Sequence, residues 1–178
     1  MSKVWLVTGS ASGLGRNIAE AVLASGDRLV ATARDPRRLK DLAEKYGDQI
    51  RTAPLDVADE QAAQASVQVA VDVFGRLDVV VNNAGYGDIA PFEQLTSERF
   101  KALESYWGNE ISDPAKVAQL ILRLAASDHL PAHLLIGSDA VEFAGQAEAT
   151  RAAEAERWRE FSVSTDVNAS GPLPAVRF

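Results

Sequence analysis

Four short runs rich in apolar residues recur in the first 81 positions, and their spacing constrains the fold more than any other feature. The runs are Val4–Val7, Leu29–Ala33, Ile50–Leu55 and Leu77–Val81. Apolar runs without polar alternation are typical of strands buried on both faces, as in a parallel sheet. Stretches with helical spacing separate them. The sequence therefore predicts an α/β fold with a doubly wound parallel sheet and right-handed crossovers.

Residues that start and stop helices support this order. Asp59 is placed to cap a helix that ends at Phe74, and Gly75 follows as a stop signal. Asp113 and Pro114 form a similar start. The other expected helices are Asn17–Ala24, Pro36–Tyr46, Leu95–Leu103 and one that Ser138 or Asp139 caps and that continues to about Arg159. The Ala, Glu and Arg residues of this last helix favour an exposed position.

The second half of the chain is expected to complete the same domain. His133–Ile136 is a strand candidate that can lie beside the fourth strand, which gives about five strands in the order 3-2-1-4-5. With 178 residues, the chain has the size of one domain. We expect a single domain over residues 1–161 and a mobile tail over residues 162–178, which are rich in Ser, Asn, Gly and Pro.

Composition excludes several kinds of partner. A net charge of −7 disfavours nucleic acid and anionic membranes, and the absence of Cys excludes disulfides and thiolate metal sites. No apolar run approaches membrane-spanning length, and the N-terminus lacks a signal-peptide pattern. These features predict a cytoplasmic protein.

A glycine-rich loop, Thr8–Gly15, lies between the first strand and the first helix. Its glycines are spaced G-x-x-x-G-x-G. Without side chains the backbone can approach a pyrophosphate, and the helix N-terminus offers free N–H donors. A plain glycine turn without a ligand is the alternative. The position between strand and helix favours dinucleotide binding.

Three motifs in order resemble the short-chain dehydrogenase/reductase family. TGSASGLG at residues 8–15 resembles its cofactor signature, Asn82-Asn83-Ala84-Gly85 matches its NNAG motif, and Asp56-Val57 follows the third strand where the family keeps an adenine-contacting Asp. The likeness runs from Met1 to about Glu104 and resumes from about Ser105 with C-terminal family features. The resemblance implies a Rossmann-like fold and a nicotinamide dinucleotide as ligand.

The end of the second strand determines which dinucleotide is preferred. An acidic residue there would bind the ribose hydroxyls of NAD, but this chain has Ala33 followed by Arg34. A guanidinium suits the 2′-phosphate of NADP, so NADP is favoured, although Asp35 tempers the preference. Arg37, Arg38 and Lys40 are interpreted as a solvated helix face. The predicted cofactor-binding residues are Gly9, Ser10, Ser12, Gly13, Leu14, Gly15, Arg34, Asp56, Val57, Asn83, Ala84 and Gly85.

The family's catalytic segment is not found in the sequence. The resemblance implies a Tyr with a Lys four residues later, together with a Ser. The fourth residue after Tyr46 is Ile50, after Tyr86 it is Ala90, and after Tyr106 it is Glu110. At about Glu104 the likeness breaks off, and from about Ser105 it resumes in the family's C-terminal region. The intervening part of the family has no counterpart here, which indicates an internal deletion at this junction. No catalytic residue is therefore assigned.

No other arrangement of residues replaces that segment. His129 and His133 flank a proline, and no carboxylate cluster gives them the spacing of metal ligands. Tyr86 is interpreted as a pocket wall, since nothing in the sequence would lower its pKa.

Three hypotheses on function remain open. The first is an NADP-binding protein without the family's carbonyl/alcohol hydride transfer. The second is an active oxidoreductase that uses replacement residues or a full-length partner, and the third is a non-functional remnant or scaffold. The deletion would also leave the fourth strand without its neighbour in the family. Either His133–Ile136 takes that place, which is the preferred arrangement, or the exposed edge forms a swapped or edge-paired dimer; a homodimer is expected in both cases.

Overall fold

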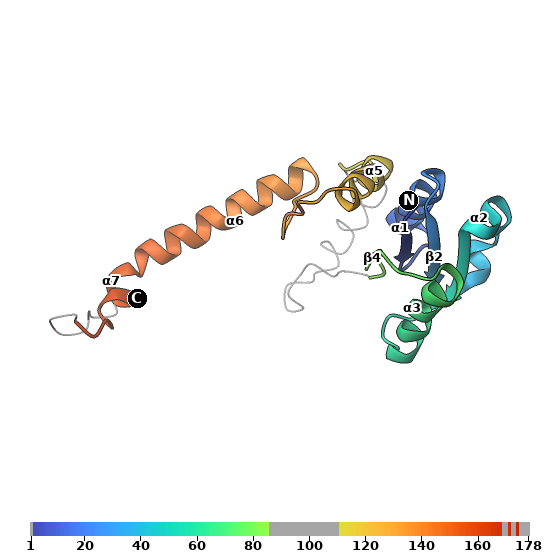
Figure 1. The fold of residues 1–178 in the computed structure, drawn as a ribbon. Coiled ribbons are helices and arrows are strands. Elements are labelled where there is room, and N and C mark those ends of the chain that lie inside the picture. The colour runs from blue at the N-terminus through green and yellow to red at the C-terminus, as the bar shows by residue number, and fades with distance from the viewer. Residues whose placement is uncertain (1, 86–110, 169–170, 172–173, 175–178) are drawn as a thin grey trace, which may run out of the picture. The chain divides into compact units, whose positions relative to one another are not determined.

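A computed structural model describes residues 2–85 and 111–168, together with Gly171 and Pro174 (Figure 1). The predicted helix Leu95–Leu103 and Tyr86 lie outside these residues. The chain divides into two compact units, Met1–Ala132 and His133–Phe178. Each unit is described by itself.

A parallel sheet forms the centre of the first unit. Its strands are β1 (Val4–Val7), β2 (Arg28–Ala33), β3 (Ile50–Pro54) and β4 (Val79–Val81), in the order β3-β2-β1-β4. In the register Leu6 lies opposite Val30 on one side and Val80 on the other. The predicted α/β fold with a Rossmann-like parallel sheet is confirmed for these four strands.

Helices cover both faces of the sheet (Figure 1). One face carries α1 (Gly13–Ala24), α2 (Lys40–Tyr46) and α5 (Pro114–Ala125), and the other carries α3 (Glu60–Phe74). Two short 3-10 helices, η1 (Pro36–Leu39) and η2 (Gly47–Gln49), flank α2.

Alternate residues of the strands form the two halves of the core. Trp5 and Val7 of β1 pack with Ile18 on one face, while Val4 and Leu6 pack with Ala70 on the other. All six are buried. This alternation on a sheet buried on both faces explains why β1 and β2 are apolar at almost every position.

The predicted fifth strand is wrong. The structure assigns no strand to His133–Ile136, and among the described residues β4 is the last strand on that side of the sheet. Leu134 and Leu135 of this segment are 46% and 51% exposed. The physical reason is that a local apolar pattern does not make a strand without a paired edge. Pairing with β4 would also require closing the long connection from Asn82 to His133, which costs conformational entropy.

Two predicted helix starts are confirmed in detail. The Asp59 carboxylate accepts hydrogen bonds from the N–H groups of Gln61 and Ala62, and Gly75 ends α3 in the left-handed region at φ 79°. Asp113 caps α5 in the same way through the N–H of Ala115 at 2.8 Å. Helix α1 begins at Gly13, four residues before the predicted start at Asn17. The sequence did not predict this first turn because it contains Gly13 and Gly15, and glycine has a low helix propensity.

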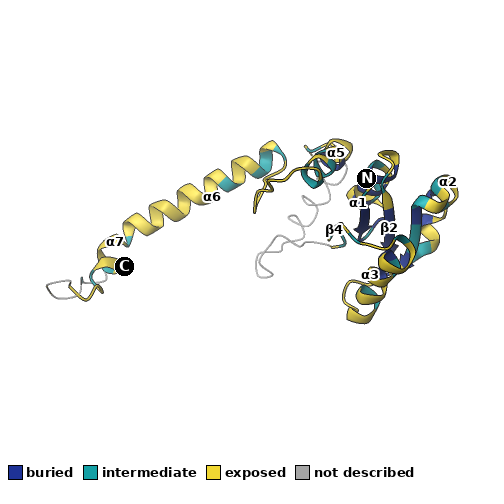
Figure 2. Cartoon of the chain, viewed as in Figure 1, coloured by how far each residue is buried: buried dark blue, intermediate teal, exposed yellow. Residues whose placement is uncertain are grey.

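The second unit is mainly helical. It contains α6 (Ser138–Arg157) and α7 (Arg159–Val163), and no residue of α6 is buried, as Figure 2 shows. The expected exposed helix is confirmed, but neither Ser138 nor Asp139 caps it. Gly137 is the N-cap instead, with a φ of 101° that favours glycine. The predicted single domain over residues 1–161 and the mobile tail over residues 162–178 stay predictions.

Within the described residues, no helix combines the length and the apolar character needed to cross a membrane. The predicted cytoplasmic location and the predicted homodimer also stay predictions.

Candidate functional site

A cleft of about 740 Å³ lies at the carboxyl ends of the strands. Each strand contributes the residues that follow it, and the N-terminus of α1 forms one wall. In open parallel sheets this edge is where ligands bind. The lining residues are Gly9, Ala11, Ser12, Gly13, Leu14, Ala33, Arg34, Asp35, Arg38, Leu55, Asp56, Val57, Asn83, Ala84 and Gly85.

Ten of the twelve residues predicted to bind a cofactor line this cleft, and the other two lie beneath it. Ser10 is fully buried, its hydroxyl donates to the Val7 carbonyl at 2.8 Å, and its N–H donates to the Thr32 carbonyl at 2.8 Å. Its side chain therefore holds the glycine loop on the sheet. Gly15 is also buried and does not line the cleft.

Two glycines allow the glycine loop to pack against the segment that follows β4. A Cβ on Gly15 would lie 2.4 Å from the Asn83 side-chain nitrogen and 2.4 Å from the Gly9 carbonyl oxygen. A Cβ on Gly9 would lie 3.0 Å from the Ala84 Cα. The missing side chains bring the two loops together, which is the packing role of glycine in such motifs.

Polar contacts of Thr8 and Asn83 fasten the same junction. The Thr8 hydroxyl accepts hydrogen bonds from the N–H groups of Asn83 and Ala84, both at 2.9 Å. The Asn83 side-chain amide donates to the Thr8 carbonyl at 2.9 Å. The segment Asn83–Gly85 is therefore held as a fixed wall of the cleft.

The N-terminus of α1 faces the cleft without a capping side chain. Ser12 is the N-cap residue, but its hydroxyl makes no capping hydrogen bond, and the first turn contains no acidic residue. Gly13 has a φ of 57°, and the space where its Cβ would lie is open. The free N–H groups and the helix dipole make this end suitable for an anion.

Basic residues after β2 differ in what they contact. Arg37 binds Asp35 through two hydrogen bonds of 2.8 and 2.9 Å, and Lys40 pairs with Glu44 at 3.4 Å. The Arg37 hydrogen bonds hold the pKa of the Asp35 carboxyl below its usual range. Arg34, in contrast, lines the cleft.

Arg38 also lines the cleft, although the sequence was interpreted as placing it on a solvated helix face. The available signal was its spacing. Arg38 lies in the turn η1 only four residues after Arg34, so a basic residue at this position is near the end of β2 in sequence.

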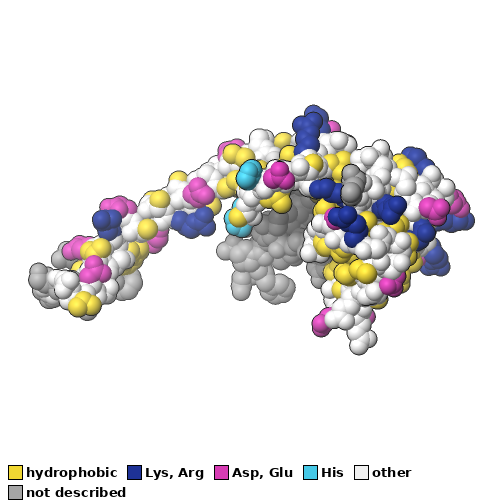
Figure 3. All heavy atoms as spheres, viewed as in Figure 1, with side chains coloured by type: hydrophobic (Ala, Val, Ile, Leu, Met, Phe, Trp, Pro, Cys, Tyr) yellow, Lys and Arg dark blue, Asp and Glu magenta, His cyan; other side chains and the backbone are white. Residues whose placement is uncertain are grey.

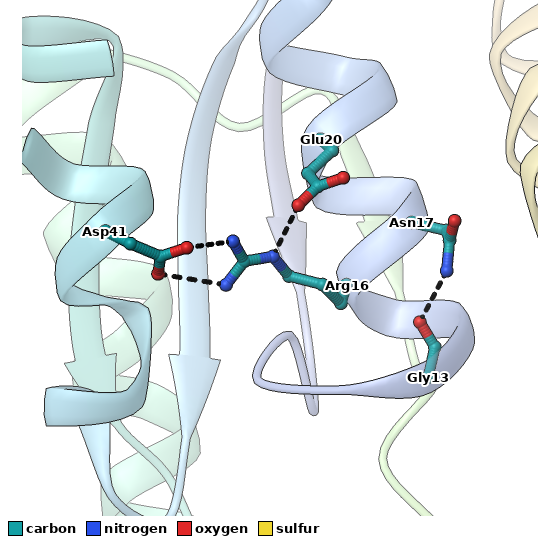
Figure 4. A network of polar contacts seen from close by, with 5 residues as sticks. All are labelled: Gly13, Arg16, Asn17, Glu20 and Asp41. Carbon is teal, nitrogen blue, oxygen red and sulfur yellow. Dashed lines mark hydrogen bonds and ion pairs between the residues drawn. The ribbon is translucent and has the colours of Figure 1, made fainter. Parts of the chain in front are cut away.

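An ion-pair network ties α1 to α2 next to the cleft (Figure 4). The Arg16 guanidinium reaches from α1 to both carboxylate oxygens of Asp41, and its Nε donates to Glu20 at 2.7 Å. The hydrogen bond to Asp41 raises the pKa of Arg16, and the same contact lowers the pKa of Asp41. On the other side of the helix, Asn17 donates to the Gly13 carbonyl at 3.0 Å. The network fixes the orientation of α2 relative to the glycine loop.

The remaining predicted residues follow β3. The Asp56 carboxylate accepts the Ala58 N–H at 3.1 Å, which closes a local turn, and the Val57 side chain is exposed. Among the described residues, the cleft lining contains no Tyr, Lys or His. Both histidines are exposed (cyan in Figure 3), and no cluster of metal-binding side chains occurs in the described part of the chain.

Comparison with known families matches this architecture. The sequence model described as short chain dehydrogenase matches residues 3–106. The chain belongs to the short-chain dehydrogenase family. A crystal structure of a short-chain dehydrogenase from Streptomyces avermitilis has the same fold, with a TM-score of 0.77, 24% identity, and coverage of 93% of this chain and 98% of that one.

Curated relatives show that this short-chain dehydrogenase is shortened. Oxidoreductase BOA17 of Botryotinia fuckeliana is 26% identical over 273 positions, which cover 93% of this chain and all of the relative. Since the chain has 178 residues, at least 95 of those positions (273 − 178) have no counterpart in it. A 2,3-dihydroxy-2,3-dihydro-p-cumate dehydrogenase of Pseudomonas putida is 39% identical over 56% of this chain, which spans only 40% of that enzyme.

The family match ends close to the predicted break. Residue 106 is within two positions of the junction between Glu104 and Ser105. The expectation of an internally shortened family member is therefore confirmed.

Proposed function

We propose that the chain is an NADP-binding protein of the short-chain dehydrogenase family that does not carry out the family's carbonyl/alcohol hydride transfer by itself. The observation that carries this proposal is the convergence, in one cleft, of the glycine loop, the arginines after β2, Asp56 after β3 and Asn83–Gly85 after β4.

The cleft fits a dinucleotide in size and in chemistry. Its volume of about 740 Å³ is within the usual range of ligand pockets. The uncapped N-terminus of α1, with open space at Gly13, suits the pyrophosphate. Asp56 and Val57 would contact the adenine, and Asn83–Gly85 would flank the nicotinamide half. When bound, the cofactor would supply hydride chemistry, while these residues bind and orient it.

The preference for NADP is supported by how the charges after β2 are arranged. Asp35 is the one acidic residue there that could repel a 2′-phosphate, and Arg37 already neutralises it. Arg34, which follows β2, and Arg38, in η1, both line the cleft. Two guanidinium groups next to a neutralised carboxylate favour a phosphate over a pair of ribose hydroxyls.

Loss of one cleft arginine is expected to weaken binding of NADPH selectively. Arg34→Gln should raise the dissociation constant of NADPH about tenfold, the usual effect of removing one charge-assisted hydrogen bond at an accessible site. The constant for NADH should change less than twofold. Titration calorimetry of wild type and variant with each cofactor measures both values.

Lys40→Gln is the matched control, because it removes the same charge from a side chain that pairs with Glu44 outside the cleft lining. It should leave both constants within twofold of wild type. If both variants weaken NADPH binding equally, Arg34 contributes only through the overall charge of the protein and not through a direct contact with the 2′-phosphate. Absence of binding to either cofactor would remove the nucleotide site altogether.

Catalysis is expected to be absent even with NADPH bound. No Tyr is followed by a Lys four residues later anywhere in the chain. The described cleft residues also offer no other group to donate the proton that carbonyl reduction requires. With NADPH and a panel of aldehydes and ketones, the absorbance of the reduced nicotinamide should fall no faster than in the same mixture without protein. A rate that survives a second purification and falls with Arg34→Gln would overturn this part of the proposal.

A further inference from the structure

The two edges of the sheet differ in how they are protected. At the outer edge of β3, Arg51 carries a charge and Pro54 lacks an N–H, and both features discourage pairing with another strand. The strand at the other edge, β4, is Val79-Val80-Val81, with neither charge nor proline. Val80 is 49% exposed, and no partner strand covers its outer side in the described residues.

The hydrogen bonds to β1 show which backbone groups of β4 point outward. The Thr8 N–H donates to the Val81 carbonyl at 3.0 Å, and Val7 lies opposite Val81 in the register. In a parallel ladder, successive residues direct their N–H and C=O groups to alternate sides. The N–H and C=O of Val80 therefore point away from β1, at the centre of the open edge.

Among the described residues, no strand of the chain itself lies at this position. At least 95 positions of the Botryotinia relative have no counterpart here. The sequence of residues 86–110 contains no second run of β-branched residues. The one downstream candidate, His133–Ile136, does not form a strand.

We propose that β4 pairs in antiparallel fashion with β4 of a second copy, about a two-fold axis at Val80. Each Val80 would then donate its N–H to the Val80 carbonyl of the other copy, so that both outward groups are satisfied by a single symmetric contact. The two four-stranded sheets would join into one continuous sheet. An isologous contact of this kind closes on itself and does not propagate into a fibre.

The charges near the edge are compatible with this register. Val79 would lie opposite Val81 of the second copy, and Asp78 opposite Asn82, so no like charges face each other. The Asp78 carboxylate already accepts the Val4 N–H at 2.8 Å and pairs with Arg76. These contacts hold its pKa below the usual range. Its charge is therefore compensated within its own chain.

The side chains add an apolar contact. Val79 and Val81 pack into the core on the α1 face, so Val80 projects from the opposite face. In the paired register the two Val80 side chains are direct neighbours across the two-fold axis, and each covers part of the other's exposed surface.

A single cysteine at Val80 tests the register directly, because the natural chain has no Cys. Opposed residues in a hydrogen-bonded antiparallel pair have Cα atoms about 5.5 Å apart, within the range that a disulfide spans. Under mild oxidation Val80→Cys should form a covalent dimer at least tenfold faster than Val67→Cys. Val67 is the matched control, since it is 40% exposed but lies on α3, away from the edge.

Light scattering of the unmodified protein completes the experiment. The expected mass is twice the chain mass of 19.1 kDa at concentrations of tens of micromolar, on the order typical of weak interfaces. A monomer mass across that range would overturn the proposal. A dimer whose Val80→Cys variant cross-links no faster than Val67→Cys would overturn it too, because the contact would then lie elsewhere. Cofactor binding is not needed for either measurement, so this result is independent of the proposed function.

Discussion

Gly15→Ala is expected to lower the free energy of unfolding by about 2 kcal/mol, the usual cost of forcing an extra carbon into a filled site. The added Cβ would lie 2.4 Å from the Gly9 carbonyl oxygen and 2.4 Å from the Asn83 side-chain nitrogen. No real Cβ contact is that short, so either the glycine loop or the segment after β4 must move.

Neither neighbour of Gly15 can move at low cost. The Gly9 carbonyl belongs to the backbone, and Gly9 itself packs against Ala84. The Asn83 amide could rotate away only by breaking its 2.9 Å hydrogen bond to the Thr8 carbonyl. Alanine favours the helical state by up to about 1 kcal/mol over glycine, and this gain reduces the loss without cancelling it.

Urea unfolding followed by circular dichroism measures the change. Gly145→Ala is the matched control, because Gly145 lies in helix α6 with nothing near the position of a Cβ. There the propensity of alanine acts alone, and stability should be unchanged or slightly higher. If Gly15→Ala is as stable as Gly145→Ala, the two loops do not pack as closely as the structure shows.

Local signals explain which parts of the fold were predictable. Strands β1, β2 and β4 stand out because strands in a sheet covered on both faces are apolar at almost every position, and α3 and α5 because Asp59 and Asp113 are efficient caps. The segment His133–Ile136 has the same local apolar pattern, yet it does not pair with any strand of the sheet. Strand formation needs a partner edge, which a local pattern does not reveal.

The site was predictable as a set of motifs but not as a set of roles. Motif positions correctly placed residues such as Gly13, Arg34 and Asn83 around one cleft. They could not show that Ser10 is buried with its hydroxyl on Val7, since burial depends on how the loop folds over the sheet. They also did not show that Arg38 lines the cleft. Which of the neighbouring arginines pairs with Asp35 depends on the folded structure, and here it is Arg37.

A second substitution, at Thr8, tests the hydrogen bonds at the same loop junction, whereas Gly15→Ala tests its packing. Gly15 controls how closely the glycine loop approaches the segment after β4, whereas Thr8 supplies the polar contacts that hold it there. Adding a methyl group at Gly15 and removing the hydroxyl at Thr8 should both loosen the Asn83–Gly85 wall of the cleft. The first acts through a steric clash and the second through lost hydrogen bonds.

Thr8→Val is expected to lower the free energy of unfolding by about 2 kcal/mol, since a donor left without a partner away from water costs about 1–3 kcal/mol. The hydroxyl accepts the N–H groups of both Asn83 and Ala84 at 2.9 Å, and Thr8 is buried. Valine has nearly the same shape but no acceptor, so packing is kept while the Ala84 N–H loses its partner and the Asn83 N–H keeps only its 3.1 Å hydrogen bond to the Val81 carbonyl.

Thr8→Ser provides the rescue, because serine keeps the hydroxyl and loses only a methyl group. It should cost about 1 kcal/mol, the value of one buried methyl. Hydrogen exchange gives a local readout: the amides of Asn83 and Ala84 should exchange markedly faster in Thr8→Val than in Thr8→Ser, while the amides of α3 change equally in both. Equal stability and equal exchange in the two variants would mean that the Thr8 hydroxyl does not hold this wall. The order of the glycine loop and of Asn83–Gly85 would then rest on the steric fit at Gly9 and Gly15 alone.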